Sequence, residues 1–242
     1  MLNGIPGRRW LRQLWGGACY RCRASVTGAD LFCPACLTEL PWIEHACERC
    51  GLPLPAASVA RCGACLKEPP PYQRVLSLFH YSAPIDRLVA DLKYRERLWA
   101  GRWLAELLAL RFEEALRGTQ LLVPVPLHPA RLRQRGFNQA IELALPLSRR
   151  LGIPLARTAV RRRQPTREQA ELSAEARRHN LTGAFACAPL SGVDRATIVD
   201  DVMTTGATVR ELALTLLDHG AGSVDVVTVA RTELRRHDSR RK

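Results

Sequence analysis

The sequence of 242 residues has few aromatic side chains, few acids and no long apolar run. Aromatic residues make up 6% of it, and 23 Asp and Glu stand against 36 Lys and Arg, which gives a formal net charge of +13. No apolar run approaches the roughly 18 residues that a membrane-spanning helix needs. The arginines near the N-terminus are not followed by the apolar stretch of a secretory signal. We therefore expect a soluble, cytoplasmic protein that does not insert into membranes.

The sequence does contain enough apolar residues for a folded core, together with a visible boundary. Hydrophobic residues make up 47% of the chain, which excludes a disordered protein. At about 150 residues per domain, the length allows one or two domains. Residues 68–72 include three consecutive prolines, which neither continue a helix nor donate to a central strand. We place a linker there, and expect one domain over residues 1–70, a second over residues 71–232 and a basic tail over residues 233–242.

Short apolar runs alternate with helical patterns after the linker. The expected strands are residues 75–81, 121–125, 184–187, 197–199 and 224–230. The expected helices are one that begins near Pro84 and three others at residues 98–116, 139–151 and 208–219. Strands that are apolar nearly throughout are typical of a parallel sheet covered by helices on both faces. The second domain is therefore predicted to have an α/β fold.

Eight of the nine cysteines form four C-x-x-C pairs in the first domain. They are Cys19, Cys22, Cys33, Cys36, Cys47, Cys50, Cys62 and Cys65. In a reducing cytoplasm, paired cysteines are more often metal ligands than disulfides. Two C-x-x-C turns direct four thiolates at one point, which suits the tetrahedral coordination of Zn²⁺. The sequence predicts two zinc sites, most simply with the first four cysteines on one ion and the last four on the other, although an interleaved pairing remains open.

Two other interpretations of this segment compete with structural zinc. Redox C-x-x-C chemistry uses one pair at the start of a helix in a βαβ unit, which does not fit four evenly spaced pairs. A catalytic zinc keeps one position open for water, whereas an all-cysteine site is closed. Tyr20, Phe32 and Trp42 lie among the ligands and form either a small ribbon core or a surface for stacking bases.

Residues 196–208, with the sequence ATIVDDVMTTGAT, combine features of a phosphate site. An expected buried strand leads through Asp200 and Asp201 into a threonine-rich turn at the start of a helix. Unpaired N–H groups and the positive end of the helix dipole favour an anion there, and Gly206 permits close approach. Adjacent carboxylates suit sugar hydroxyls or a hydrated Mg²⁺. The pattern predicts a ribose phosphate, with loop contacts from Thr204, Thr205, Gly206, Ala207 and Thr208.

The same stretch resembles the 5-phosphoribosyl 1-pyrophosphate (PRPP) motif of type I phosphoribosyltransferases. In that motif, apolar residues precede two acids and a T-G-x-T loop. The resemblance implies that Asp200 and Asp201 are the catalytic pair, holding the ribose hydroxyls, and that residues 204–208 hold the 5′-phosphate. Such enzymes displace pyrophosphate with the help of Mg²⁺ and cationic groups, and they need no protein nucleophile.

Two arginine-rich segments supply candidate cations. Residues 123–128 leave an expected strand and lead into the first of these segments. Asn138, a short distance further on, is a good helix N-cap. In the phosphoribosyltransferase fold, this position is the pyrophosphate loop. Residues 161–169 fall where the fold carries a lid that closes over substrate. The resemblance therefore implies pyrophosphate and lid contacts from His128, Arg131, Arg135, Arg162 and Arg163.

Over nearly its whole length, the chain resembles the ComF family, the competence protein F type of phosphoribosyltransferase-like proteins. The resemblance rests on the paired cysteines, on VPVPLHPARLRQRGFNQA at residues 123–140, on RRQPT at residues 162–166 and on the PRPP motif. It implies a type I phosphoribosyltransferase-like sheet behind a double zinc ribbon. It also implies a part in natural competence and the use of external DNA.

Three functions remain open from the sequence. The first is PRPP binding, with Mg²⁺, in the uptake or use of DNA, together with proteins of the uptake machinery. The second is an active phosphoribosyltransferase acting on an unidentified base or amine. The third is a module that binds single-stranded DNA and has a vestigial PRPP site, which the excess of arginine favours.

Overall fold

The central element of the fold is a four-stranded parallel sheet. A computed structural model describes residues 17–28, 30–56, 58–163 and 183–233. The sheet order is β3 (Val75–His80), β8 (Ser223–Arg231), β7 (Arg195–Met203) and β4 (Leu121–Pro124), with every pair parallel. The strands are buried along most of their length because helices cover both faces.

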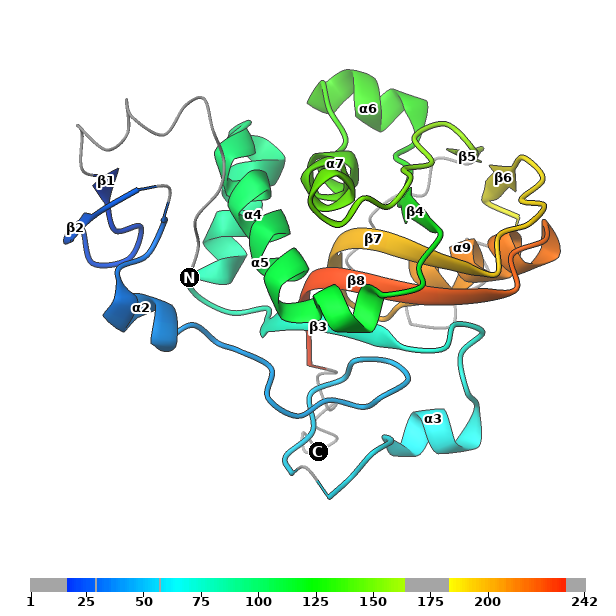
Figure 1. Ribbon diagram of the computed structural model, residues 1–242, viewed down its shortest axis with the longest axis horizontal. Helices are drawn as coiled ribbons and strands as arrows, with labels where there is room; N and C mark the ends of the chain where they lie inside the picture. Colours follow the sequence, from blue (N-terminus) through cyan, green and yellow to red (C-terminus); the bar gives the residue numbers. More distant parts are fainter. Residues whose placement is uncertain (1–16, 29, 57, 164–182, 234–242) are drawn as a thin grey trace, which may run out of the picture.

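Three helices cover one face of the sheet and one helix covers the other (Figure 1). Helices α4 (Ile85–Tyr94), α5 (Leu98–Leu116) and α7 (Gln139–Leu151) pack together on the first face, and α9 (Ala207–Asp218) lies on the second. Two separate apolar cores result, one on each face. The predicted parallel sheet flanked by helices is confirmed. Among the described residues, no helix has both the length and the apolar character needed to cross a bilayer.

One local expectation was wrong. Residues 184–187 do not enter the parallel sheet, because β6 (Phe185–Cys187) pairs antiparallel with β5 (Val160–Arg162) in a separate ribbon. Only Phe185 is buried in β6, as in a ribbon with one covered face. Residues 125–128 after β4 form a loop, and this loop leads into α6 (Pro129–Arg135), which begins with a proline and ends at Gly136 with φ +80°.

The first cysteine segment packs against the helices. It contains β1 (Gly17–Ala18), β2 (Ser25–Val26) and α2 (Pro34–Thr38). Phe32 is buried and its ring centroid lies 5.2 Å from that of Trp103 in α5. Its apolar residues therefore belong to the same core as α4, α5 and α7.

The second cysteine segment packs against the edge of the sheet at β3. It contains α3 (Gly63–Lys67) and lies below the sheet in Figure 1. The Ile43 N–H donates to the Leu78 carbonyl at 2.9 Å, and the His80 N–H donates to the Pro41 carbonyl at 2.8 Å. These bonds cover the edge strand, which is otherwise open to pairing. The rings of Trp42 and Phe79 pack 4.5 Å apart, so Trp42, like Phe32, is a packing residue.

Candidate functional site

The carboxyl edge of the sheet collects the charged residues of the predicted site. All four strands are parallel, so their carboxyl ends meet at one edge, which is where open α/β sheets bind ligands. Asp200 and Asp201 lie near the end of β7, Arg231 ends β8, and the loop after β4 leads to His128. β7 is longer than the strand predicted over residues 197–199. Both acids therefore belong to β7 itself, and the pairing of β7 with β8 holds them in place.

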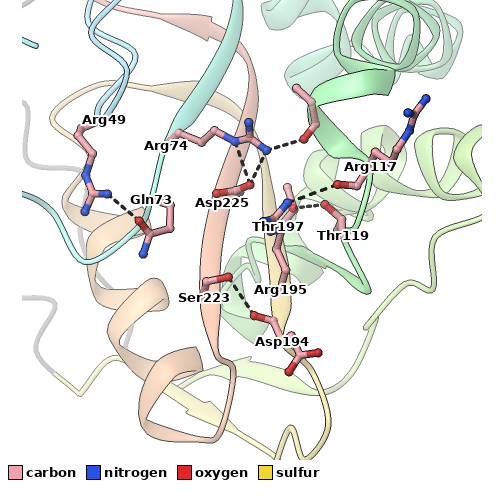
Figure 2. Close-up of polar contacts among 11 residues, drawn as sticks. Arg49, Gln73, Arg74, Arg117, Thr119, Asp194, Arg195, Thr197, Ser223 and Asp225 are labelled. Carbon is pink, nitrogen blue, oxygen red and sulfur yellow. Dashed lines mark hydrogen bonds and ion pairs between the residues drawn. The ribbon is translucent and has the colours of Figure 1, made fainter. Parts of the chain in front are cut away.

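The opposite edge differs, because its polar groups bond to one another (Figure 2). Arg74 forms a 3.0 Å ion pair with the buried Asp225. The hydroxyls of Thr119 and Thr197 lie 2.9 Å apart, and Ser223 donates to the Asp194 carbonyl at 2.9 Å. These contacts fasten the strand starts to the neighbouring loops. The carboxyl edge is therefore the candidate site.

At the carboxyl edge, Asp201 is paired with a lysine that sequence reasoning missed. The Lys93 ammonium, at the end of α4, forms an ion pair with the Asp201 carboxylate, whose side chain is 5% exposed. Burial by itself lowers the pKa of Lys93, but Asp201 outweighs burial and the net shift is upward. The lysine thus stays protonated beside Asp201.

Asp200 lies beside this pair without a cation of its own bonded to it among the described residues. One of its carboxylate oxygens accepts the backbone N–H of Asp201 at 2.9 Å. Burial, followed by repulsion from Asp201, raises the pKa of Asp200 well above the usual range of aspartate. Crowded carboxylates with raised pKa values are typical of binding and catalytic sites.

The predicted phosphate loop joins β7 to α9. Thr204 and Thr205 are exposed, and the Thr205 hydroxyl accepts the Ala207 N–H at 3.4 Å. Gly206 is the N-cap of α9 with φ +80°, and a Cβ there would lie 2.5 Å from the Met203 Cε. Glycine is therefore required both by the backbone conformation and by packing. The N-terminus of a 12-residue helix faces the loop, as anion binding requires.

The candidate pyrophosphate residues lie after β4, around α6. His128 is the N-cap of α6, and its Nδ1 accepts the Ala130 N–H at 3.3 Å. Asn138 caps α7 as predicted, and its amide nitrogen also donates to the Val125 carbonyl at 3.0 Å, which ties α7 to the end of β4. Arg131 lies in α6. Arg135 donates to Gln139 at 2.8 Å and stacks over Tyr94 in α4, 5.3 Å from the ring centroid.

The candidate lid residues lie at one end of the β5–β6 ribbon. Arg162 stacks over Phe185 with its guanidinium 5.7 Å from the ring centroid, and the Arg163 N–H donates to the Ala184 carbonyl at 2.8 Å. Residues 164–169, the rest of the predicted lid, lie outside the described part of the chain. The β5–β6 ribbon packs on α9 through β6.

The eight cysteines form two clusters with the predicted composition. The sulfur atoms of Cys19, Cys22, Cys33 and Cys36 lie within 4.8 Å of one another, as do those of Cys47, Cys50, Cys62 and Cys65. The Sγ atoms of Cys22 and Cys33 are 3.7 Å apart, and so are those of Cys50 and Cys62. A tetrahedron with Zn–S bonds of about 2.3 Å requires a separation of about 3.8 Å. The donor sets fit two structural Zn²⁺ ions in sequential pairing.

Both clusters also donate backbone N–H groups to sulfur at equivalent positions. The Cys33 N–H points to the Cys19 sulfur at 3.4 Å, and the Cys62 N–H points to the Cys47 sulfur at 3.3 Å. The residue after each first pair has a positive φ, +68° at Arg23 and +64° at Gly51. The two segments are thus copies of one ribbon structure, with backbone N–H groups directed at equivalent ligand sulfurs.

Two residues of the site came from the structure alone. Arg231 lies at the end of the second domain and is 2% exposed at the end of β8, and nothing in its local sequence distinguishes it. Lys93 did carry a signal, because it follows Ile85 and Val89 at helical spacing on the apolar face of α4. A lysine in that register is expected to point inward and to need an acid as partner.

Comparison with known proteins extends over both parts of the chain. Residues 10–66 match the double zinc ribbon domain family. The chain is 39% identical over 223 residues to DNA utilization protein YhgH of Escherichia coli, covering 89% of this chain and 97% of that protein. It is 35% identical over 222 residues to competence protein F of Haemophilus influenzae, covering 88% and 96%. A purine phosphoribosyltransferase from Pyrococcus horikoshii matches 58% of this chain at 18% identity, covering 95% of that chain with a TM-score of 0.33.

Proposed function

Because the chain belongs to the ComF family, with DNA utilization protein YhgH and competence protein F as relatives, we propose that it binds PRPP and acts in the uptake or use of external DNA. The observation that carries the proposal is the pair Asp200 and Asp201 at the carboxyl edge, followed directly by the loop at the start of α9. One ligand that joins a phosphate to vicinal hydroxyls suits both features.

Each part of the ligand has a matching group. Residues 204–208 provide exposed threonine hydroxyls and N–H groups at the helix start for the 5′-phosphate. Asp200 and Asp201 accept hydrogen bonds from the ribose hydroxyls, and the ion pair with Lys93 holds the Asp201 carboxylate in position. The charge of the pyrophosphate group is met by His128, Arg131 and Arg135, and by Arg162 and Arg163 at the end of the β5–β6 ribbon.

The carboxylate pair also fits Mg²⁺, which takes oxygen ligands. Repulsion between Asp200 and Asp201 raises the pKa of Asp200 beyond the effect of burial, and a nearby cation relieves that repulsion. When bound, Mg²⁺ supplies positive charge to the pyrophosphate group. The protein holds the sugar in place beside it.

Calorimetric titration with PRPP and Mg²⁺ tests the proposal. We expect binding by the wild-type protein and a loss of at least about tenfold in affinity for Asp200→Asn, since a charge-assisted hydrogen bond contributes roughly 1.5 to 3 kcal/mol. Asp218→Asn, at the exposed far end of α9, is the matched control and should bind normally. Equal affinity in all three proteins, or no binding by the wild type, would overturn the proposal.

The same titration cell separates binding from transfer. If the protein is also a transferase, pyrophosphate is released from PRPP only when a base or amine acceptor is present, and Asp200→Asn abolishes the release. The third function predicts binding of single-stranded DNA that weakens steeply with salt, whether or not PRPP binds. The arginine excess favours binding of single-stranded DNA as an additional activity, since residues 127–178 hold twelve Arg against four Glu.

A further inference from the structure

One buried arginine joins the second cysteine cluster to the phosphate loop. Arg231 is 2% exposed, and its Nη1 donates to the carbonyls of Met203 at 3.1 Å and of Thr204, where the loop begins. Its Nε donates to the Cys50 carbonyl at 3.2 Å. A single planar guanidinium therefore fixes a zinc ligand's backbone relative to the backbone of the loop.

The residues on both sides of this link are closely packed. A Cβ on Gly51, the residue after Cys50, would lie 2.8 Å from the Val75 Cγ1 of β3. A Cβ on Gly206 would lie 3.5 Å from the hydroxyl oxygen of Tyr72, which is itself buried. Close-packed interiors transmit displacement instead of absorbing it. A shift of the second cluster therefore reaches the loop through Arg231.

The charge of Arg231 also links it to the second cluster. The Arg231 guanidinium donates to neutral carbonyls, and a buried cation needs a compensating negative charge. Four thiolates around one Zn²⁺ carry a net charge of about −2. With metal bound, the second cluster is the counter-charge beside Arg231. Without metal, the ribbon loses the bonds that define it, and Arg231 loses its fixed acceptor.

We propose that the zinc ion of the second cluster holds the phosphate loop in its binding conformation, with Arg231 as the positioning residue between them. The ligand of that loop rests on the function proposed above, but the coupling itself does not. The first cluster serves as the contrast: Tyr20 beside it donates to Asp91 at 3.0 Å, so it is fastened to α4 and not to the backbone of the loop.

Amide hydrogen exchange of a peptide covering residues 203–209 tests the coupling without any ligand. Cys65→Ser in α3 and Cys36→Ser in α2 change equivalent ligands of the two clusters. We expect exchange of this peptide to rise about tenfold or more in Cys65→Ser and to stay near wild type in Cys36→Ser. No rise in Cys65→Ser, or an equal rise in both variants, would overturn the proposal.

Two arginine variants in the same region distinguish a link made by Arg231 from a simpler role, in which the second ribbon only covers the loop. Arg231→Gln should retain two zinc ions per chain and yet loosen the loop peptide. Arg49→Gln is the matched control, since Arg49 bonds Gln73 and the Pro70 carbonyl instead of the loop. If the amides of β7 and β8 also exchange faster in Arg231→Gln, that variant has unfolded. The comparison of Cys65→Ser with Cys36→Ser then tests the proposal by itself.

Reciprocity supplies a readout that a purely structural role does not move. If zinc favours the binding conformation of the loop, a ligand on the loop must raise the affinity of the second cluster for zinc by the same factor. PRPP should therefore reduce the amount of zinc that a competing chelator removes at equilibrium from the second cluster only, and not in Arg231→Gln. A loop that loosens on zinc loss in a protein that binds no PRPP would refute the proposed function and leave the coupling standing. Binding of PRPP with unchanged zinc release would refute the coupling alone.

Discussion

Single residues at the carboxyl edge carry more charge than a buried site usually tolerates. Asp200 and Asp201 are adjacent, and Lys93 forms an ion pair with Asp201 but not with Asp200. A buried carboxylate without a partner costs several kcal/mol, so this arrangement is retained at the expense of stability. The cost makes sense where a ligand or Mg²⁺ completes the charge balance.

Lys93→Met is expected to destabilise the protein by about 2 to 3 kcal/mol, because it leaves Asp201 buried and unpaired. The figure is below that of a fully buried pair, since the Lys93 side chain is 20% exposed. Urea unfolding measures it. The double variant Lys93→Met/Asp201→Asn should recover more than half of the loss. Arg117→Met, which breaks an exposed pair with Glu114, should change little.

Asp200→Asn should have the opposite effect on stability. The folded-state pKa of Asp200 is raised, so the folded protein binds this proton more tightly than the unfolded chain does. Stability is therefore lost as pH rises between the unfolded and the folded pKa. Removing the charge should raise the free energy of unfolding at neutral pH, and the gain should disappear below the unfolded pKa. A variant that is less stable than wild type at neutral pH would contradict the raised pKa.

The contiguous part of the site was predictable from sequence, whereas the paired part was not. Asp200, Asp201 and residues 204–208 stand together in one motif, so their placement at a strand end follows from local pattern. Lys93 and Arg231 reach the site only because β3, β8 and β7 are neighbours in the sheet. Their partners are set by topology, which a single sequence does not specify.

Among the elements, the loop before α9 combines a residue of positive φ with the proposed phosphate contacts. Gly206 has φ +80°, and so does Gly192, at +79°, in the turn before β7. The two glycines differ in surroundings, because nothing lies within 4 Å of a Cβ at Gly192, whereas the Met203 Cε lies 2.5 Å from one at Gly206. They form a matched pair.

Gly206→Ala and Gly192→Ala should both lower stability by about 1 to 2 kcal/mol, from the positive φ. Only Gly206→Ala should weaken PRPP binding, because its methyl group displaces Met203 and the loop. Thermal unfolding and titration with PRPP measure the two effects. Equal loss of binding in both variants would show that global stability, and not loop shape, controls affinity.

The elements with strong periodicity were predicted well, and the short ones were not. The helices at residues 98–116 and 139–151 are confirmed to the residue, because their apolar stripes and caps agree. The strand predicted at residues 197–199 extends to Arg195–Met203, since pairing on both sides carries polar residues into the ladder. Three residues of β6 read equally well as sheet or ribbon, and only tertiary packing distinguishes them.

At the scale of the whole molecule, zinc ribbons and sheet form one structure with two attachments. The first ribbon extends the core of the helices, and the second covers the edge of β3 and reaches the phosphate loop. The formal charge of +13 falls when thiolates bind zinc, but the arginine excess at residues 127–178 remains. A basic body around one anion site is consistent with both a phosphorylated sugar and a nucleic acid.

The most direct test of the account is to map where PRPP with Mg²⁺ protects the amides of the zinc-loaded protein from hydrogen exchange. The account predicts protection at residues 200–208 and in the segment after β4 around His128. It predicts no change at the opposite edge, in the starts of β7 and β8 near Arg195 and Ser223 (Figure 2). Protection confined to the opposite edge or to the first ribbon, or none anywhere at saturating ligand, would contradict a PRPP site at the carboxyl edge of the sheet.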